Sequence, residues 1–192
     1  MTCIAAVAEG GLVWMGGDGR GMSGWDICQQ RQPKVFRVGD LVLGSSGSQR
    51  MHQLVQRGLE DGLERHEDGA RTFDYLVGCV VPVMRRCLAD GGCLKTTDGV
   101  AEFEGAVLIG YRGGLYVVSS DLGVSDIDRD VMAIGSGGDY ALGALYATRE
   151  SGAHPMDRLR TALAAAATFN ASVGPPYAFI MPGNDVACVS CG

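Results

Sequence analysis

The sequence predicts an α+β fold of four layers (αββα), in which two antiparallel β-sheets pack face to face between two pairs of helices. Short apolar segments occur in pairs separated by glycine-containing turns, a pattern that is typical of antiparallel hairpins. Two segments with helical spacing follow the first four strands, and two more precede the last strands. Strands and helices do not alternate, so a parallel sheet is not expected, and helix pairs would cover the outer face of each sheet.

The first half of the chain contains two predicted hairpins and two predicted helices. The expected strands are Cys3–Ala8 and Leu12–Gly16, followed by Lys34–Val38 and Leu41–Ser45. Ser48 is a suitable N-cap for a helix whose apolar residues recur every three or four positions as far as Leu63. A second helix is expected over about 73–88, with a kink at Pro82. Residues 90–100 are rich in Gly and Asp, and we expect a loop there.

The second half is predicted to contain a hairpin, a further strand, two helices and two closing strands. The expected strands are Ala106–Tyr111, Leu115–Ser119 and Val131–Ile134, and near the end Tyr177–Met181 and Val186–Val189. A glycine-rich turn at 135–138 leads into a predicted helix, Tyr140–Arg149. Pro155 is placed to open an alanine-rich helix that ends near Phe169, because proline is well tolerated in the first helical turn.

Length and composition are those of one globular domain, and we expect residues 1–192 to form it. Hydrophobic residues make up 46% of the chain and charged residues 20%. No apolar run approaches the roughly 18 residues of a membrane helix, and the N-terminus lacks a positively charged leader, so we expect a cytoplasmic protein without membrane contact. A net charge of −6 with mixed signs gives no broad positive field, so we expect no nucleic-acid partner.

Seven scattered cysteines indicate reduced thiols rather than a disulfide framework. Cys188 and Cys191 form one C-x-x-C, which is also a partial zinc motif. A zinc site needs a second pair of ligands, and the three histidines lie at unrelated spacings. We therefore expect small residues on a terminal strand, and neither a metal nor a cofactor.

Thr2 is the first candidate for chemistry. A threonine hydroxyl needs a base beside it, and the free α-amine of an N-terminal threonine can be that base. An α-amine has a pKa of about 7.7–8.0, near the operating pH, whereas lysine at about 10.4 stays protonated. Methionine before a small residue is usually removed, so loss of Met1 would give Thr2 this amine. Retention of Met1 would block it.

Asp18 and Lys34 are the candidates for charged partners of Thr2. Strands one and two form a hairpin, so the end of the second strand, at Asp18, returns beside the start of the first. Lys34 would reach the same place if the third strand bordered this pair. Its ammonium would stabilise a developing alkoxide, and the carboxylate would keep the lysine charged. The alternative is a surface ion pair or two unrelated residues.

Three segments resemble the proteasome β-subunit family, in particular its bacterial HslV type: TCIAAVAEGGLVWMGGDGRGMSG, PKVFRVGDLVLGSSGS and VMAIGSGGDYALGALYA. The resemblance covers 2–50 and 131–150 well, and the rest only by element order. It implies the fold of the N-terminal nucleophile (Ntn) hydrolases and a threonine-type endopeptidase that degrades peptides or unfolded proteins. It also implies a homo-oligomeric ring with internal active sites and an ATP-dependent unfoldase as partner.

The family's site residues are carried over position by position. The nucleophile and its amine fall on Thr2, and the aspartate–lysine pair on Asp18 and Lys34. The oxyanion-binding amide falls on Gly47. The serine that supports the threonine amine falls on Ser136, within the G-S-G-G turn.

The chain departs from the family near the end of its last helix. Members commonly carry a second acidic or polar pair there, close to the threonine amine. Here the segment 167–176 holds no aspartate, and Thr168, Asn170 and Ser172 are the candidates that could replace the pair. Cys3 stands where threonine is frequent, and we expect it to face the core rather than to compete as a nucleophile.

Several alternatives stay open. A catalytically silent ring-forming subunit would have the same fold, and a single-chain amidase acting on a small amide would share the nucleophile. The segment 19–24 satisfies G-x-G-x-x-G but leads into a poor helix ending at Pro33, so a dinucleotide site is not favoured. The segment 135–138 joins strand to helix and would suit a phosphate, but it has no Walker lysine.

Overall fold

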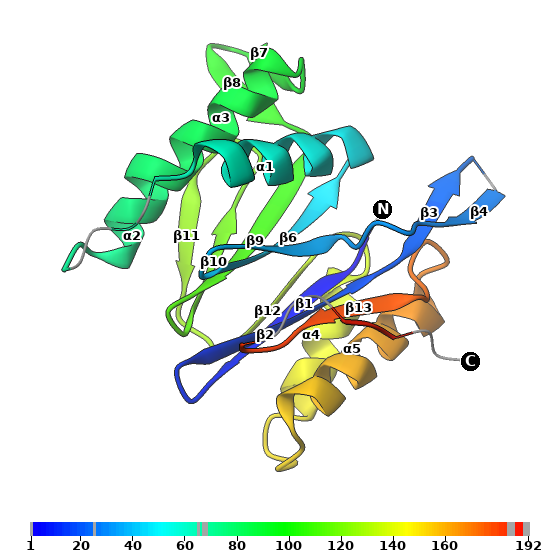
Figure 1. Ribbon diagram of the computed structural model, residues 1–192. Helices are drawn as coiled ribbons and strands as arrows, with labels where there is room; N and C mark the ends of the chain where they lie inside the picture. Colours follow the sequence, from blue (N-terminus) through cyan, green and yellow to red (C-terminus); the bar gives the residue numbers. More distant parts are fainter. Residues whose placement is uncertain (1, 25, 65, 67–68, 184–186, 190–192) are drawn as a thin grey trace.

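The computed structural model describes residues 2–24, 26–64, 66, 69–183 and 187–189, which form two stacked β-sheets covered on both outer faces by helices. All strand pairs within these ranges are antiparallel. Figure 1 shows α1, α2 and α3 above one sheet, and α4 and α5 below the other. The predicted four-layer α+β fold is therefore confirmed.

The first sheet has the strand order β12-β1-β2-β13-β14. Its members are β1 (Ile4–Glu9), β2 (Leu12–Asp18), β12 (Val131–Ile134), β13 (Tyr177–Ile180) and β14 (Ala187–Val189). The predicted first hairpin is correct, and its register pairs Ile4 with Gly17. The end of β2 therefore lies beside the start of the chain.

The second sheet has the order β11-β10-β9-β6-β5. Its members are β5 (Val35–Val38), β6 (Leu41–Gly47), β9 (Gly105–Tyr111), β10 (Gly114–Val118) and β11 (Val124–Ile127). The predicted hairpins over 34–45 and 106–119 are both present. The strand β11 was not expected, because its sequence alternates with polar residues and follows a turn at Leu122 that the pattern did not reveal.

In the described ranges, five α-helices flank the sheets, and a π-helical turn joins two of them. They are α1 (Gln49–Gly62), α2 (Thr72–Tyr75), the π-helix η1 (Leu76–Val80), α3 (Val81–Asp90), α4 (Gly138–Ala147) and α5 (Pro155–Phe169). Ser48 is the N-cap of α1 as predicted, since its side chain accepts a hydrogen bond from the Met51 amide. The irregularity expected at Pro82 is the π-helical turn just before it. There the Val81 amide bonds to the Leu76 carbonyl, five residues back, and Pro82 follows in the first turn of α3.

Three apolar layers hold these elements together. Side chains such as Leu43, Leu59 and Met84 pack between the second sheet and its helices. Ile4 and Met15 belong to the layer between the two sheets. The third layer packs α4 and α5 on the first sheet. Because each sheet buries both of its faces, the expected sandwich explains the long apolar runs of its central strands.

Two hairpins were missed by the sequence analysis. Residues 90–100 are not a loop, because β7 (Leu94–Thr97) and β8 (Val100–Phe103) form a hairpin there. Its turn is Asp98-Gly99, and both residues have positive φ, which is the favoured two-residue turn. The predicted loop is wrong, because the Gly- and Asp-rich composition of this segment belongs to a hairpin turn and not to a loop without strands. The second hairpin joins β3 (Arg20–Ser23) to β4 (Asp26–Gln29).

The hairpin β3–β4 also decides the meaning of the G-x-G-x-x-G pattern. The segment 20–23 is an extended strand and not a turn into a helix, so no helix N-terminus is available there for a pyrophosphate. Among the described helices, none is both long and apolar enough to cross a membrane. The predicted strand 186–189 is present over 187–189, while Val186 and Cys191 of the C-x-x-C lie outside the described residues.

Candidate active site

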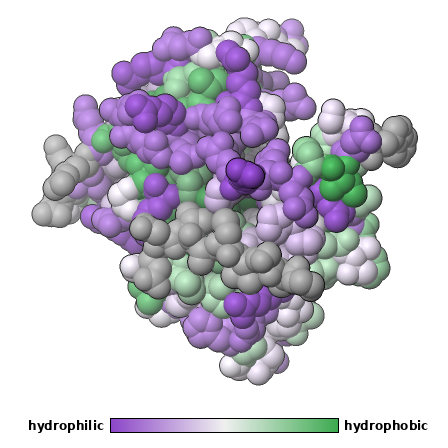
Figure 2. Space-filling model, turned by 45° about the vertical axis from the view of Figure 1, so that its right-hand side comes forward, coloured by the Kyte–Doolittle hydropathy of each residue, from purple (hydrophilic) through white to green (hydrophobic). Residues whose placement is uncertain are grey.

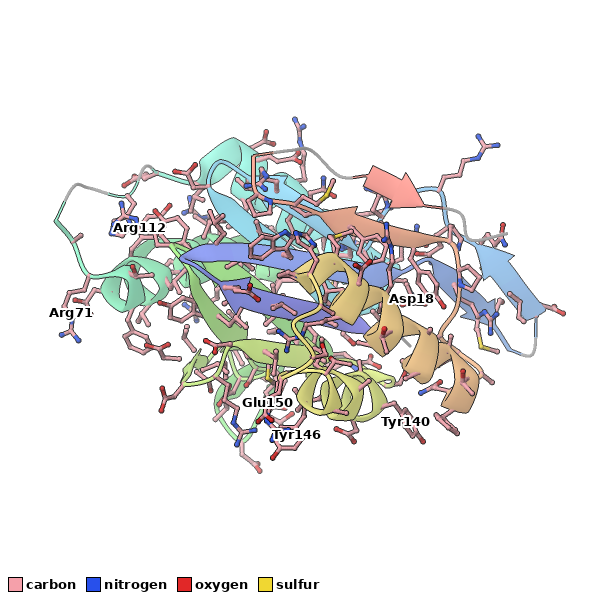
Figure 3. The ribbon with its side chains drawn as sticks, turned by 90° about the horizontal axis from the view of Figure 1, so that it is seen from below. Asp18, Arg71, Arg112, Tyr140, Tyr146 and Glu150 are labelled. Carbon is pink, nitrogen blue, oxygen red and sulfur yellow. The ribbon has the colours of Figure 1, made fainter. Side chains whose placement is uncertain are left out.

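The carboxylate of Asp18 is buried at the end of β2, next to the Thr2–Cys3 peptide. Its side chain is fully shielded from solvent. Oδ1 accepts a hydrogen bond of 2.9 Å from the Cys3 amide, and Oδ2 accepts one of 3.1 Å from the Arg20 amide. Figure 3 shows Asp18 within the fold, on the far side of α5 in this view. A buried carboxylate requires such partners, and these fix its orientation relative to the chain start.

Lys34 supplies the cationic partner of Asp18. Its Nζ lies 2.9 Å from Asp18 Oδ1 and also donates to the Arg20 carbonyl at 2.7 Å. The lysine is only 7% exposed. The pair is therefore a buried, hydrogen-bonded ion pair, and the alternative of a surface pair is wrong.

The route by which Lys34 reaches the site differs from the one expected. Lys34 comes immediately before β5, which belongs to the second sheet and not to the sheet of β1 and β2. The third strand therefore does not border the first hairpin within one sheet. Instead, the lysine extends from one sheet to the other, and its ion pair with Asp18 joins the two sheets at the edge of the sandwich.

Thr2 and Ser136 are brought together by the pairing of β1 with β12. The Thr2 nitrogen donates a hydrogen bond of 3.2 Å to Ser136 Oγ. The Gly137 amide donates to the Thr2 carbonyl at 3.2 Å. Gly135 has φ of +92°, and a Cβ there would collide with the Thr2 carbonyl oxygen, so the turn needs glycine at this position. The turn 135–138 thus holds the start of the chain rather than a phosphate.

A line of hydrogen bonds continues from Ser136 away from Thr2. Ser136 Oγ and Ser172 Oγ are 3.2 Å apart, and Ser172 Oγ donates to Asn170 Oδ1 at 2.6 Å. Because Ser172 donates its proton to Asn170, the hydrogen between the two serines comes from Ser136, whose hydroxyl also lies within 3.4 Å of the Thr2 carbonyl as a second acceptor. Ser136 then accepts from the Thr2 nitrogen. When Ser136 donates to Ser172 rather than to the Thr2 carbonyl, the bonds run from the Thr2 nitrogen through two hydroxyls to a neutral amide.

Of the three candidates near the end of α5, two take part in this line and one does not. Asn170 Nδ2 also donates to the Ser136 carbonyl at 2.7 Å, which fixes the amide relative to the turn. Thr168 instead donates to Ala164 within α5. The chain therefore places Asn170 and Ser172 where the family commonly has a second acidic or polar pair.

A polar pocket of about 270 Å³ opens beside Thr2. Thr2, Lys34 and Gly47 all contribute to its wall, and so do β3, the segment before β5 and the first turn of α1. Gly47 ends β6 with φ of +155° and packs against the Glu104 carbonyl, where a Cβ has no room. Figure 2 turns the side with the N-terminus and β3 forward, and shows mostly hydrophilic residues over its upper part, with a hydrophobic patch toward the β3–β4 hairpin.

His52 and Ser45 also line this pocket and were missed by the sequence analysis. His52 Nδ1 lies 2.6 Å from Ser45 Oγ. Burial lowers the pKa of His52 to about 4, an effect opposed by the Pro33 carbonyl and increased by the Lys34 charge. The imidazole is therefore neutral at pH 7. Its spacing of three and seven residues from Val55 and Leu59 places it on the buried face of α1, which was the available signal.

Cys3 is not a competing nucleophile. It is fully buried, and burial together with the neighbouring Asp18 carboxylate raises the pKa of its thiol to about 12, despite the opposing Lys34 charge. A thiol with this pKa is not ionised at neutral pH and cannot attack. In the described part of the chain, no three His, Cys, Asp or Glu side chains gather closely enough to hold a metal ion.

The fold of this chain is similar to those of several solved structures. No family model matches the chain. BPH from Thiobacillus denitrificans, solved in complex with epoxomicin, is similar with a TM-score of 0.76 and 21% identity, over 98% of this chain and 100% of that one. HslV from Trypanosoma brucei gives a TM-score of 0.70 and 19% identity, over 98% and 99%. The Anbu complex of Pseudomonas aeruginosa, described as a helical assembly, gives 0.65 and 21%, over 99% and 87%.

These likenesses extend over nearly the whole chain, while the sequence identities stay between 19% and 21%. At this identity they establish architecture and leave activity to be argued from the site. The predicted resemblance is confirmed at this level: the chain has the Ntn-hydrolase fold of the proteasome and HslV type.

Proposed function

We propose that the chain is a threonine-type endopeptidase in which Thr2, once Met1 is removed, is both nucleophile and base. The observation that carries the proposal is the convergence of three groups on the Thr2–Cys3 segment. Ser136 accepts from the Thr2 nitrogen, Asp18 accepts from the Cys3 amide, and Lys34 pairs with Asp18 beside the same pocket. This set of residues serves no obvious packing purpose, because burying charged groups costs free energy.

The proposed first step is attack by the Thr2 hydroxyl on a peptide carbonyl. The α-amine takes the hydroxyl proton as the new C–O bond forms, and the Lys34 ammonium stabilises the negative charge that develops on Oγ. We assign the backbone N–H of Gly47 to the oxyanion. The amine then gives its proton to the leaving nitrogen, the C–N bond breaks, and an ester to Thr2 remains.

The second step is hydrolysis of that ester. The amine takes a proton from a water molecule, whose oxygen adds to the ester carbonyl, and the Thr2 oxygen leaves as a hydroxyl when the proton returns to it. Asn170, Ser172 and Ser136 orient the amine through the directed hydrogen bonds described above. The same amine therefore acts as the base in both steps, because it belongs to the nucleophilic residue itself.

We further propose that copies of the chain assemble into a closed homo-oligomeric ring whose chamber admits peptides or unfolded protein. Large aromatic side chains are exposed on α4 and at the end of α5: Tyr140 (45%), Tyr146 (63%) and Phe169 (69%). The rings of Tyr140 and Phe169 stack at 5.7 Å. Figure 3 shows Tyr140 and Tyr146 at the outer edge of the molecule. Apolar area of this kind commonly marks subunit contacts, and we expect them here.

Peptidase assays on three versions of the protein test the activity. The mature wild-type protein should hydrolyse unstructured peptides without ATP, Thr2→Ser should retain part of this rate, and Thr2→Ala should lose it while forming the same oligomer. A mature protein with a free Thr2 amine and no hydrolysis of any peptide would instead support the second candidate, a silent ring-forming subunit. That candidate is favoured by the absence of an aspartate from 167–176, which leaves the neutral amide of Asn170 at the end of the hydrogen bonds to the Thr2 nitrogen.

A further inference from the structure

The pocket beside Thr2 contains features that bear on which side chain it accepts. The residue that precedes the cleaved bond (P1) carries the carbonyl that Thr2 attacks. Its side chain is therefore the part of the substrate nearest to the pocket. The choice of P1 side chain rests on the proposed function, because it concerns the substrate of that same site.

The charges along the pocket wall are unbalanced. Within the described chain, no aspartate or glutamate lines the pocket, whereas Arg20 and Lys34 both do. The charge of Lys34 is offset by Asp18, which lies behind it and outside the lining. Of the described ion pairs, none involves Arg20. One positive charge therefore remains at the wall, and an incoming cation would be repelled.

Arg20 is held in place rather than mobile. Its Nη1 donates to the Ala171 carbonyl at 2.8 Å. Its guanidinium also packs directly against the backbone of Gly174, where an added Cβ would come within 2.5 Å of it. A guanidinium has five N–H donors in a planar fork that suits a carboxylate. Because the side chain is already ordered, binding an anion costs little additional conformational entropy.

The first turn of α1 adds a second positive feature to the same wall. Ser48 and Gln49 line the pocket at the N-terminal end of a 14-residue helix. No acidic residue lies in that first turn, so its partial positive charge is not neutralised locally. The remaining wall is mixed: the amides of Gln30 and Gln32 contribute polar groups, the neutral His52 adds no charge, and Met22 adds an apolar side chain.

We propose that this pocket selects an acidic P1 side chain, so that the enzyme cleaves after glutamate in preference to glutamine, apolar or basic residues. The arginine and the helix end would bind the carboxylate, and the glutamine amides would bind its second oxygen. A volume of about 270 Å³ accommodates a side chain of this size. The polar groups that make up most of the lining would lose hydrogen bonds to leucine or phenylalanine, with only Met22 offering an apolar contact, and the uncompensated positive charge disfavours lysine or arginine.

A set of fluorogenic peptides that differ only at P1 tests the proposal on the mature wild-type protein. The P1 residues are Glu, Gln, Leu, Phe and Arg, and kcat/KM is measured at pH 7. We expect Glu to exceed Gln by about tenfold and Arg by more, the size that one favourable charge contact provides. A Glu:Gln ratio of one or less, or a preference for Leu or Phe, overturns the proposal.

Three variants at two positions test the assigned residues. Gln49→Glu places a carboxylate at the helix end without changing shape, and the exposed position tolerates it. The Glu:Arg ratio of kcat/KM should fall by about tenfold or more. Arg20→Gln should lower the rate for P1 Glu to that for P1 Gln, and Arg20→Lys should restore part of the difference. An unchanged Glu:Arg ratio in Gln49→Glu contradicts the proposal.

The two proposals fail in different ways. Hydrolysis of the P1 Leu peptide by the wild type but not by Thr2→Ala, with no preference for Glu, leaves the peptidase in place and rejects the acidic pocket. No hydrolysis of any of the five peptides by a protein whose mass shows loss of Met1 rejects the peptidase itself.

Discussion

Lys34 Nζ and Asp18 Oδ1 are 2.9 Å apart and join the two sheets of the sandwich where the chain begins. Asp18 also accepts from the Cys3 amide, so the same carboxylate positions the lysine and the residue that follows Thr2. The pair therefore fixes both the position of the positive charge near Thr2 and the position of the backbone at Cys3. Removing either member would leave a buried charge without its partner.

Lys34→Met should abolish most of the activity and destabilise the fold. The change keeps the length of the side chain but leaves Asp18 buried and unpaired, which costs about 3–5 kcal/mol. Loss of the charge that stabilises the Thr2 alkoxide should lower kcat by at least about 100-fold. Urea unfolding and peptide hydrolysis measure the two effects separately.

The control for this change is Arg57→Met. Arg57 forms an exposed i,i+4 pair with Asp61 on α1, and its removal should cost about 0.5 kcal/mol or less. Near-normal turnover in Lys34→Met would show that the lysine has no electrostatic role in catalysis.

Asn170→Asp should shift the pH dependence of hydrolysis to higher pH. A carboxylate at the end of the line of hydrogen bonds favours the protonated form of the Thr2 amine and so raises its pKa. The base form then appears at higher pH, and the acidic limb of kcat/KM should move up by about half a pH unit. Asn170→Ala removes the hydrogen bonds without adding charge and should lower the rate without an upward shift. If the acidic limb of kcat/KM has the same midpoint in the wild type, Asn170→Asp and Asn170→Ala, then Asn170 does not influence the pKa of the Thr2 amine.

Gly47→Ala should lower both activity and stability, because a Cβ at this position collides with the Glu104 carbonyl and the backbone must move. The assigned oxyanion amide would move with it, and we expect a loss of about 100-fold in kcat. Gly10→Ala is the matched control. Gly10 also has positive φ (+58°) but has open space around it, so the two variants share only the backbone strain. Comparable activity in the two would remove Gly47 from the mechanism.

His52 should make the wild-type protein less stable as the pH falls from 7 to 5. Its pKa is about 4 in the folded protein and 6.5 in the unfolded chain, so the unfolded chain binds more protons in this range. The free energy of unfolding therefore rises with pH. Titration of His52 accounts for about 2 kcal/mol of the rise between pH 5 and pH 7. His52→Gln should lack this contribution. Urea unfolding of both proteins at the two pH values measures the difference, and parallel losses in both would show that other groups are responsible.

The sequence predicted much of the architecture because the hairpins and helices carry local signals. Alternating apolar segments with glycine turns identified β1 with β2 and β5 with β6, and the Ser48 cap identified the start of α1. The same local signal was available for the β7–β8 hairpin at Asp98-Gly99, but the segment was interpreted by composition. The hairpin β3–β4 is exposed, with weak alternation, and no core requirement marks it in the sequence.

The candidate site was only partly predictable for a different reason. Asp18 could be placed beside Thr2 because a hairpin register connects them. Lys34 could not be placed on the opposite sheet, since contacts between sheets leave no local pattern. The choice among Thr168, Asn170 and Ser172 depended on how the loop after α5 turns toward Ser136. Arg20 reaches the pocket by tertiary packing alone, whereas His52 could have been placed on the buried face of α1 by its spacing but not in the pocket.

Intact-mass spectrometry with and without a peptide epoxyketone is the most direct measurement of the central claim. The reagent presents a ketone and an epoxide that a hydroxyl and an adjacent free amine attack together. We predict a protein lighter by one methionine that gains one equivalent of the reagent, and no gain in Thr2→Ala. A protein that cleaves peptides while still carrying Met1 would contradict the account, since Thr2 would then have no amine to serve as its base.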